Sequence, residues 1–124
     1  MATITDHMYD EDTDSMYVRL SPLLPIVNST EITFGTSMTL VADYLLDDTI
    51  VGLEVLEAST FLASLTLHEI HNASNYLETW FIDAENRHPC GIRRHATDDP
   101  RIQLLIHRES KKLLGIRIMK SPRP

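Results

Sequence analysis

The chain has 124 residues and a formal net charge of −7, with 43% hydrophobic and 23% charged residues. These proportions are ordinary for a globular protein and exclude disorder along most of the chain. No apolar run reaches the roughly 20 residues of a membrane span, and the polar segment 1–14 has no signal-peptide pattern. Cys90 is the only cysteine, which excludes an intramolecular disulfide. We therefore expect a cytoplasmic protein without a membrane partner.

Alternation of apolar and polar residues predicts strands in the first half of the chain. Residues 16–20 place Met16, Val18 and Leu20 on one face, which is the period of a strand with one buried face. A short strand is expected at 31–34. The clearest unit is a hairpin, in which runs 39–46 and 50–56 flank an Asp-Asp-Thr turn.

The second half begins with an ambiguous segment. Residues 58–67 are rich in helix formers, but the pattern across 61–72 fits a helix or a strand. The choice decides whether His68 and His71 share a face, since residues three apart do so only in a helix. Further predicted elements are a strand at 76–82, a loop at 83–89, a short basic strand at 90–95 and a hairpin formed by 102–107 and 113–119.

The two hairpins resemble each other when the chain is shifted by 63 residues. Gly52 then falls on Gly115 inside the same aliphatic alternation, Val41 falls on Leu104, and the charge between the aliphatics changes from Glu54 to Arg117. A glycine within a strand marks a bulge or a close backbone approach. Both hairpins are therefore expected to pack in the same way.

This pattern predicts an α+β fold built from two tandem copies of an antiparallel β-meander, sharing a core and joined by a short helix. The expected organisation is a first repeat at 1–60, a connecting helix or linker at 61–75 and a divergent second repeat at 76–124.

Charge is distributed unevenly between the two halves. Residues 1–72 hold 12 acidic and 1 basic residue, a balance of −11, whereas residues 73–124 hold 6 acidic and 10 basic residues, a balance of +4, which together give −7. Such a distribution favours electrostatic attraction within or between chains. The candidate binding residues of the basic half are Arg93, Arg94, Arg108, Lys111, Lys112 and Arg117.

Metal and catalytic motifs are weak. His88, Cys90 and His95 are residue types that bind zinc, but their spacing is irregular. The acidic residues of segment 10–14 favour a solvated turn over a cation site because they lack an EF-hand pattern. No phosphate-binding loop or nucleophile motif is present, so no catalytic residue and no cofactor is predicted.

Two segments resemble the small bacterial YuzE-like family, a domain of unknown function. They are residues 9–20 (YDEDTDSMYVRL) and residues 51–59 (VGLEVLEAS). The resemblance covers the first copy, whereas the second copy, 76–121, is similar only in its closing hairpin. It implies a compact antiparallel sheet followed by a helix. It establishes no activity, although some relatives look like partners of toxin-like proteins, which suggests an antitoxin-type role.

The leading functional hypothesis is a small non-enzymatic module for protein binding or regulation, which binds a protein partner or forms a homodimer. The alternative is anion or nucleic-acid binding through the basic half, where Trp80 and Tyr76 could stack on bases. A third hypothesis is a metal-dependent enzyme that uses the histidines.

Overall fold

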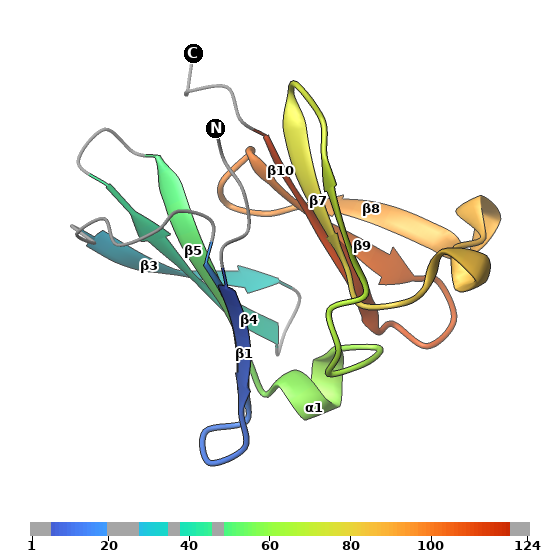
Figure 1. Cartoon of the computed structure of the whole chain (residues 1–124), viewed down its shortest axis with the longest axis horizontal. Helices are drawn as coiled ribbons and strands as arrows, with labels where there is room; N and C mark the ends of the chain where they lie inside the picture. The colour runs from blue at the N-terminus through green and yellow to red at the C-terminus, as the bar shows by residue number, and fades with distance from the viewer. Residues whose placement is uncertain (1–5, 20–27, 35–37, 46–48, 120–124) are drawn as a thin grey trace. The chain divides into compact units, whose positions relative to one another are not determined.

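The computed structural model describes residues 6–19, 28–34, 38–45 and 49–119 (Figure 1). The chain divides after Ala58 into two compact units. Each unit contains one five-stranded sheet in which all neighbouring strands are antiparallel. No helix within these described ranges is long and apolar enough to cross a membrane.

The sheet of the first unit has the strand order β1-β2-β5-β4-β3. The strand predicted at 16–20 is confirmed over residues 16–19, and the hairpin predicted at 39–56 is confirmed by the pairing of its two strands; residues 20 and 46–48 lie outside the described residues. The additional strand β1 lacks the alternation that would have predicted it; its Met8 side chain is 60% exposed. The strands are β1 (Asp6–Asp10), β2 (Ser15–Arg19), β3 (Asn28–Phe34), β4 (Met38–Tyr44) and β5 (Ile50–Leu56).

The sheet of the second unit has the order β6-β7-β10-β9-β8. Both strands of its predicted hairpin have the expected bounds, and the loop predicted at 83–89 contains a turn of 3-10 helix. The elements are β6 (Glu69–Asn72), β7 (Tyr76–Trp80), β8 (Ile92–Ala96), β9 (Ile102–His107) and β10 (Leu113–Met119), with 3-10 turns η1 (Ala84–Asn86) and η2 (Pro89–Gly91) before β8.

Helix is scarcer than the α+β prediction implies. The antiparallel architecture is confirmed, but the α-helix α1 covers only Ala58–Phe61 instead of 58–67. The ambiguous segment ends as strand β6, which pairs with β7 from Glu69 opposite Trp80 to Asn72 opposite Leu77. Backbone pairing with β7 therefore overrides the local helix propensity. Because His71 lies in this strand and His68 precedes it, the helical histidine pair does not form.

The two sheets share their strand order and an irregularity at the same place. In the first, Asp43 pairs with Gly52 and Tyr44 with Ile50, which leaves Val51 as an extra residue in β5. In the second, Leu105 pairs with Gly115 and Ile106 with Leu113, which leaves Leu114 as the extra residue in β10. Both glycines therefore follow a β-bulge, one of the two features that a glycine within a strand marks.

Both glycines also allow a close approach. A Cβ atom on Gly52 would collide with the phenol oxygen of Tyr17. On Gly115 it would collide with the backbone carbonyl of Thr79 and lie 3.2 Å from Cε3 of Trp80. Residues of β2 thus fill the space where a side chain of Gly52 would lie, and residues of β7 fill the corresponding space at Gly115.

One predicted equivalence is wrong by a single residue. Strand pairing makes Ala42, and not Val41, the counterpart of Leu104, because Ala42 lies opposite Leu53 as Leu104 lies opposite Ile116. The reason is turn length: residues 45–49 join the paired positions in the first hairpin, and residues 107–112, one residue more, join them in the second.

Each sheet has an apolar face and a polar face, because successive side chains in a strand point to opposite sides. On the apolar faces the side chains are buried. The opposite face of the second sheet, called here its polar face, carries Glu78 and Trp80 of β7, Arg94 of β8, Leu105 of β9 and Gly115 and Arg117 of β10. The buried residues of the apolar faces include Met16, Val18, Leu40, Ala42, Leu53 and Val55 in the first unit, and Leu77, Ile102, Leu104, Ile116 and Ile118 in the second.

Candidate functional site

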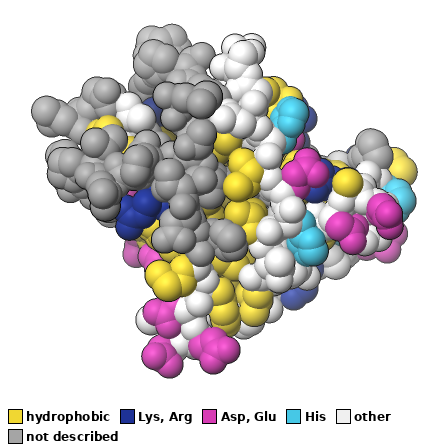
Figure 2. Space-filling view, in the orientation of Figure 1, with side chains coloured by type: hydrophobic (Ala, Val, Ile, Leu, Met, Phe, Trp, Pro, Cys, Tyr) yellow, Lys and Arg dark blue, Asp and Glu magenta, His cyan; other side chains and the backbone are white. Residues whose placement is uncertain are grey.

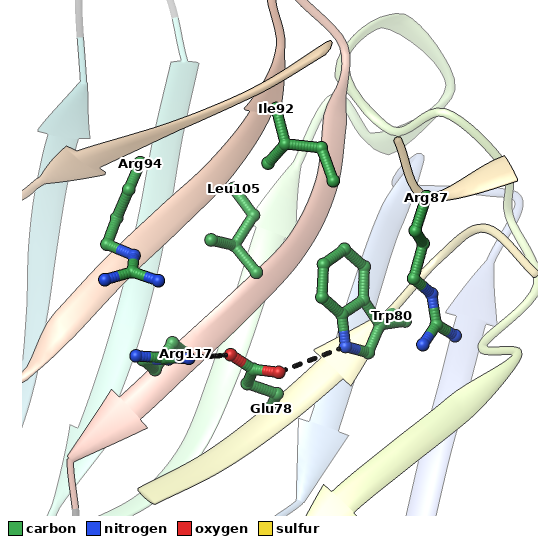
Figure 3. A pocket seen from close by; sticks show the side chains of 7 residues that line it. All are labelled: Glu78, Trp80, Arg87, Ile92, Arg94, Leu105 and Arg117. Carbon is green, nitrogen blue, oxygen red and sulfur yellow. Dashed lines mark hydrogen bonds and ion pairs between the residues drawn. The ribbon is translucent and has the colours of Figure 1, made fainter. Parts of the chain in front are cut away.

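The polar face of the second sheet contains an open hollow of about 380 Å³ (Figure 3). It combines three guanidinium groups, one carboxylate and an apolar floor. In Figure 3, Arg94 and Arg117 lie on the same side of Leu105, and Arg87 lies beyond the ring of Trp80. The lining residues are Glu78, Trp80, Arg87, Ile92, Arg94, Leu105 and Arg117.

An apolar cluster forms the floor of this hollow. Trp80, only 9% exposed, packs with Leu105 and Leu114, and the half-buried Ile82 and Ile92 lie against them. Strands β7, β9 and β10 place the three buried members, since Trp80 and Leu105 both lie opposite Gly115. Glycine at this position leaves room for the indole ring, whose Cε3 already lies 3.2 Å from the site of a Cβ atom.

Glu78 anchors one end of the hollow. Its carboxylate accepts hydrogen bonds from Nε of Arg117 at 2.7 Å and from the indole N–H of Trp80 at 3.3 Å. The side chains of Glu78 and Arg117 are 10% and 20% exposed, and the Arg117 guanidinium also lies 4.1 Å from the ring centroid of Tyr76. Arg117 is therefore held in place by a partly buried ion pair and a cation–π contact.

Arg87 reaches the hollow from the segment between η1 and η2. Its terminal nitrogens donate to both carboxylate oxygens of Glu69, at 3.2 and 3.3 Å, and to the carbonyl of Ile82. Its guanidinium carbon lies 4.4 Å from the ring centroid of Trp80. The buried Nε of Arg87 has no hydrogen-bond partner among the residues that the structure describes.

Arg94 differs from the other two arginines. It is exposed on β8, opposite Leu105, and no hydrogen bond or ion pair is found for it among the residues that the structure describes. Its planar guanidinium offers five N–H donors that match a carboxylate or phosphate. Among the three arginines of the hollow, Arg94 is the one available to an incoming anion.

The corresponding positions of the first sheet hold a closed hydrogen-bond network. The carboxylate of Asp43, 7% exposed, accepts hydrogen bonds from the hydroxyl of Tyr17 at 2.8 Å and from that of Ser29 at 2.7 Å. Burial, followed by the hydrogen bond to Asp43, raises the pKa of Tyr17 from its ordinary value of 10.0 to about 12. This carboxylate already has its donors within the unit.

The structure separates the basic residues that the sequence grouped. Arg94 and Arg117 line the hollow, whereas Arg93 is exposed on the other face of β8. Arg108 and Lys111 are exposed in the turn between β9 and β10, and Nζ of Lys112 donates to the carbonyl of Thr60.

Several lining residues were missed or misread in the sequence. The sequence suggested Trp80 as a residue that could stack on bases, and the structure shows that it is buried and also lines the hollow. Glu78 alternates with Trp80 in a strand that was predicted, and this spacing was a usable signal. Arg87 lies in a predicted loop, so no periodicity could have placed it.

The proposed metal ligands are distributed over different elements. His88 precedes η2, Cys90 is exposed within η2, and His95 lies on β8 opposite Leu104. Within the described ranges, no three His, Cys, Asp or Glu side chains are grouped so that they could hold a metal ion. The acidic residues 10–12 are exposed at the turn between β1 and β2, at the foot of the space-filling view (Figure 2).

Comparison with known proteins concerns the first unit. The family model described as Protein of unknown function (DUF2283) matches residues 8–59. No curated protein and no solved structure matches the chain. The resemblance predicted for the first copy is confirmed: residues 8–59 match this family of unknown function, and the second unit lies outside the match.

Proposed function

We propose that this protein is a small non-enzymatic binding module and that the polar face of its second sheet contacts a segment of a partner protein. The supporting observation is the hollow in which Arg94, without a hydrogen bond or ion pair to any described residue, lies beside an apolar floor that includes Trp80. Tryptophan and arginine are enriched among the residues that dominate protein–protein binding energies. An apolar centre with charged groups at its rim is the usual anatomy of such contacts.

The chemistry of the hollow favours binding over catalysis. Its carboxylate, Glu78, already accepts hydrogen bonds from Arg117 and Trp80. A carboxylate whose oxygens already accept these hydrogen bonds is not positioned to take a proton from a substrate. The family match concerns a group of unknown function and adds no activity. An antitoxin-type role, in which the partner is a toxin-like protein, is one form that this proposal could take.

We also propose that the two units are tandem copies of one meander that share a core. Their identical strand order supports a duplication, as does the bulge before Gly52 and Gly115. The two copies then differ in the chemistry of their polar faces. The first has a self-contained carboxylate network, and the second has a hollow lined by Arg94, for which the described ranges offer no hydrogen-bond or ion-pair partner.

A comparative pull-down from the native host tests the binding proposal. The bait proteins are the wild type, Arg94→Glu and the control Arg93→Glu, which makes the same charge change on the other face of the same strand. We expect mass spectrometry to find a partner that Arg94→Glu loses and Arg93→Glu retains. Equal recovery of every protein with all three baits, with both variants folded by circular dichroism, would contradict the proposal.

Nucleic-acid or anion binding is the second candidate. Arg108 and Lys111 are exposed in the turn between β9 and β10, where they could contact a phosphate backbone. Such binding depends steeply on salt because bound counterions are released. Failure of the protein to bind an oligonucleotide at ~50 mM salt would remove this candidate.

A further inference from the structure

We infer that the hollow of the second sheet is a carboxylate-binding site in which Arg94 holds an acidic side chain of the partner segment. The identity of the partner as a protein rests on the proposed function. The carboxylate class rests on a comparison between the two sheets. The bound carboxylate would take over the acceptor role that Asp43 has in the first sheet.

Strand pairing defines this equivalence position by position. In the second sheet, one row across the strands runs Arg94, Leu105, Gly115, Trp80 and Glu69. The equivalent row of the first sheet runs Ser29, Asp43, Gly52, Arg19 and Asp6. Arg94 therefore occupies the position of Ser29, and Leu105 occupies the position of Asp43.

The two rows satisfy their polar groups differently. In the first, Asp43 is the acceptor, and Ser29 donates to it across the strand pair. In the second, the donor has become a guanidinium and the acceptor has become an apolar side chain. This row of the second sheet thus has a donor, Arg94, two strands away from the glycine, but it has no carboxylate at the position of Asp43. A charged donor gains most from an ionised acceptor, which here must come from another molecule.

The surroundings favour a singly charged carboxylate over a phosphate. The carboxylate of Glu78 is paired with Arg117, and Arg87 is paired with Glu69. Of the three lining arginines, Arg94 is the one that has no ion pair within the described part of the chain. The carboxylate of Glu78 repels a dianion more strongly than a monoanion. Trp80, Leu105 and Ile92 provide an apolar surface for the aliphatic stem of an acidic side chain.

A peptide-binding measurement tests the inference, with Trp80 as the reporter because it is the only tryptophan. The probe is a capped peptide of alternating Glu and Ala, and the matched control is its Gln–Ala counterpart. We expect a saturable change in tryptophan fluorescence and in the indole N–H resonance with the Glu peptide alone. Inorganic phosphate and a short oligothymidylate should bind more weakly. Tighter binding of either would overturn the carboxylate assignment.

Substitution of Arg94 tests its role directly. Arg94→Gln should weaken binding of the Glu peptide about tenfold, the loss expected for one charge-assisted hydrogen-bonded pair. The control Arg93→Gln should change the affinity less than about twofold. Equal affinities for the wild type and Arg94→Gln would overturn the inference, while the pull-down could still support a protein contact.

A second variant introduces into the second sheet the internal carboxylate that the first sheet has at Asp43. Leu105→Asp supplies an internal carboxylate opposite Arg94, and it should abolish peptide binding although Arg94 is intact. Leu105→Asn, which lacks the charge, should retain more binding. Stronger peptide binding by Leu105→Asp than by Leu105→Asn would contradict the inference. If neither variant folds, Arg94→Gln decides the question.

Two results would separate this inference from the proposed function. Peptide binding that requires Arg94, without any Arg94-dependent partner in the pull-down, supports the carboxylate site and contradicts the protein-partner proposal. Self-association of the wild type at low salt that Arg94→Gln abolishes would overturn a separate partner and assign the site to a second copy of the chain.

Discussion

At the scale of single residues, the two polar faces differ in the groups that donate hydrogen bonds to their carboxylates. Asp43 is enclosed by the hydroxyls of Tyr17 and Ser29, and Glu78 by Arg117 and Trp80. Both carboxylates lie on the polar faces of their sheets and are largely buried. A buried carboxylate is tolerated only when its charge is paired or hydrogen-bonded. The donors differ: hydroxyl groups bind Asp43, whereas a guanidinium binds Glu78. Loss of each carboxylate should therefore have different consequences.

Tyr17 provides a prediction for alkaline pH. Because its pKa in the folded protein is raised from 10.0 to about 12, its contribution to stability is fully present below pH 10 and is lost as pH rises towards 12. In Asp43→Asn, the pKa of Tyr17 should fall towards 10.0. Phenolate absorbance during a pH titration measures this change, and an unchanged pKa would show that Asp43 does not control Tyr17.

Glu78 and Glu69 form a matched pair of tests. Glu78→Gln leaves Arg117 partly buried without its counterion and should lower the free energy of unfolding by about 1.5–3 kcal/mol, the range for a hydrogen bond between charged groups. Glu69→Gln removes the ion pair of Arg87, where the carboxylate side chain is 45% exposed, and should cost less than about 1 kcal/mol. Urea unfolding monitored by Trp80 gives both values. A reversed order would contradict the assigned roles.

At the scale of secondary-structure elements, the bulged strands β5 and β10 set the polar faces. Each places a glycine after its extra residue, and an aromatic side chain of the neighbouring strand contacts the glycine. A bulge bends a strand and increases its local twist. The glycines are required by these contacts, since a Cβ atom at either position would collide with a neighbouring strand.

The two glycines should differ in their tolerance of alanine. Gly115→Ala meets the backbone carbonyl of Thr79, which cannot move away without disturbing β7, and should cost about 1–3 kcal/mol. Gly52→Ala meets the hydroxyl end of a side chain, that of Tyr17, and should cost less. Adding Tyr17→Phe should recover part of the loss in Gly52→Ala. Urea midpoints of the single and double variants measure this coupling.

At the scale of the whole molecule, two sheets of the same strand order carry opposite charge. The acidic residues concentrate before residue 73 and the basic residues after it. Glu54 and Arg117 occupy equivalent positions beside the glycine-centred bulges. The positive potential of the second unit can attract an anionic partner. In the first unit, the carboxylate of Asp43 is bound by donors of the same unit.

The proposal of a shared core makes a prediction about cooperativity. If the two units unfold together, Asp43→Asn in the first unit should shift the urea midpoint that Trp80 reports from the second. Independent units would leave the Trp80 midpoint unchanged, and that result would contradict a common core. Circular dichroism, which reports on both sheets, should then show a second transition.

The sequence by itself determined the strands with clear alternation and the glycine-centred hairpins, because side-chain period and turn residues are local properties. The β9–β10 hairpin has the bounds that its pattern predicted. The tertiary structure alone decided that residues 69–72 form a strand, that Ala42 matches Leu104, and that Arg87, Arg94 and Arg117 surround one hollow. These features depend on pairing and packing between residues distant in sequence, which a local pattern does not encode.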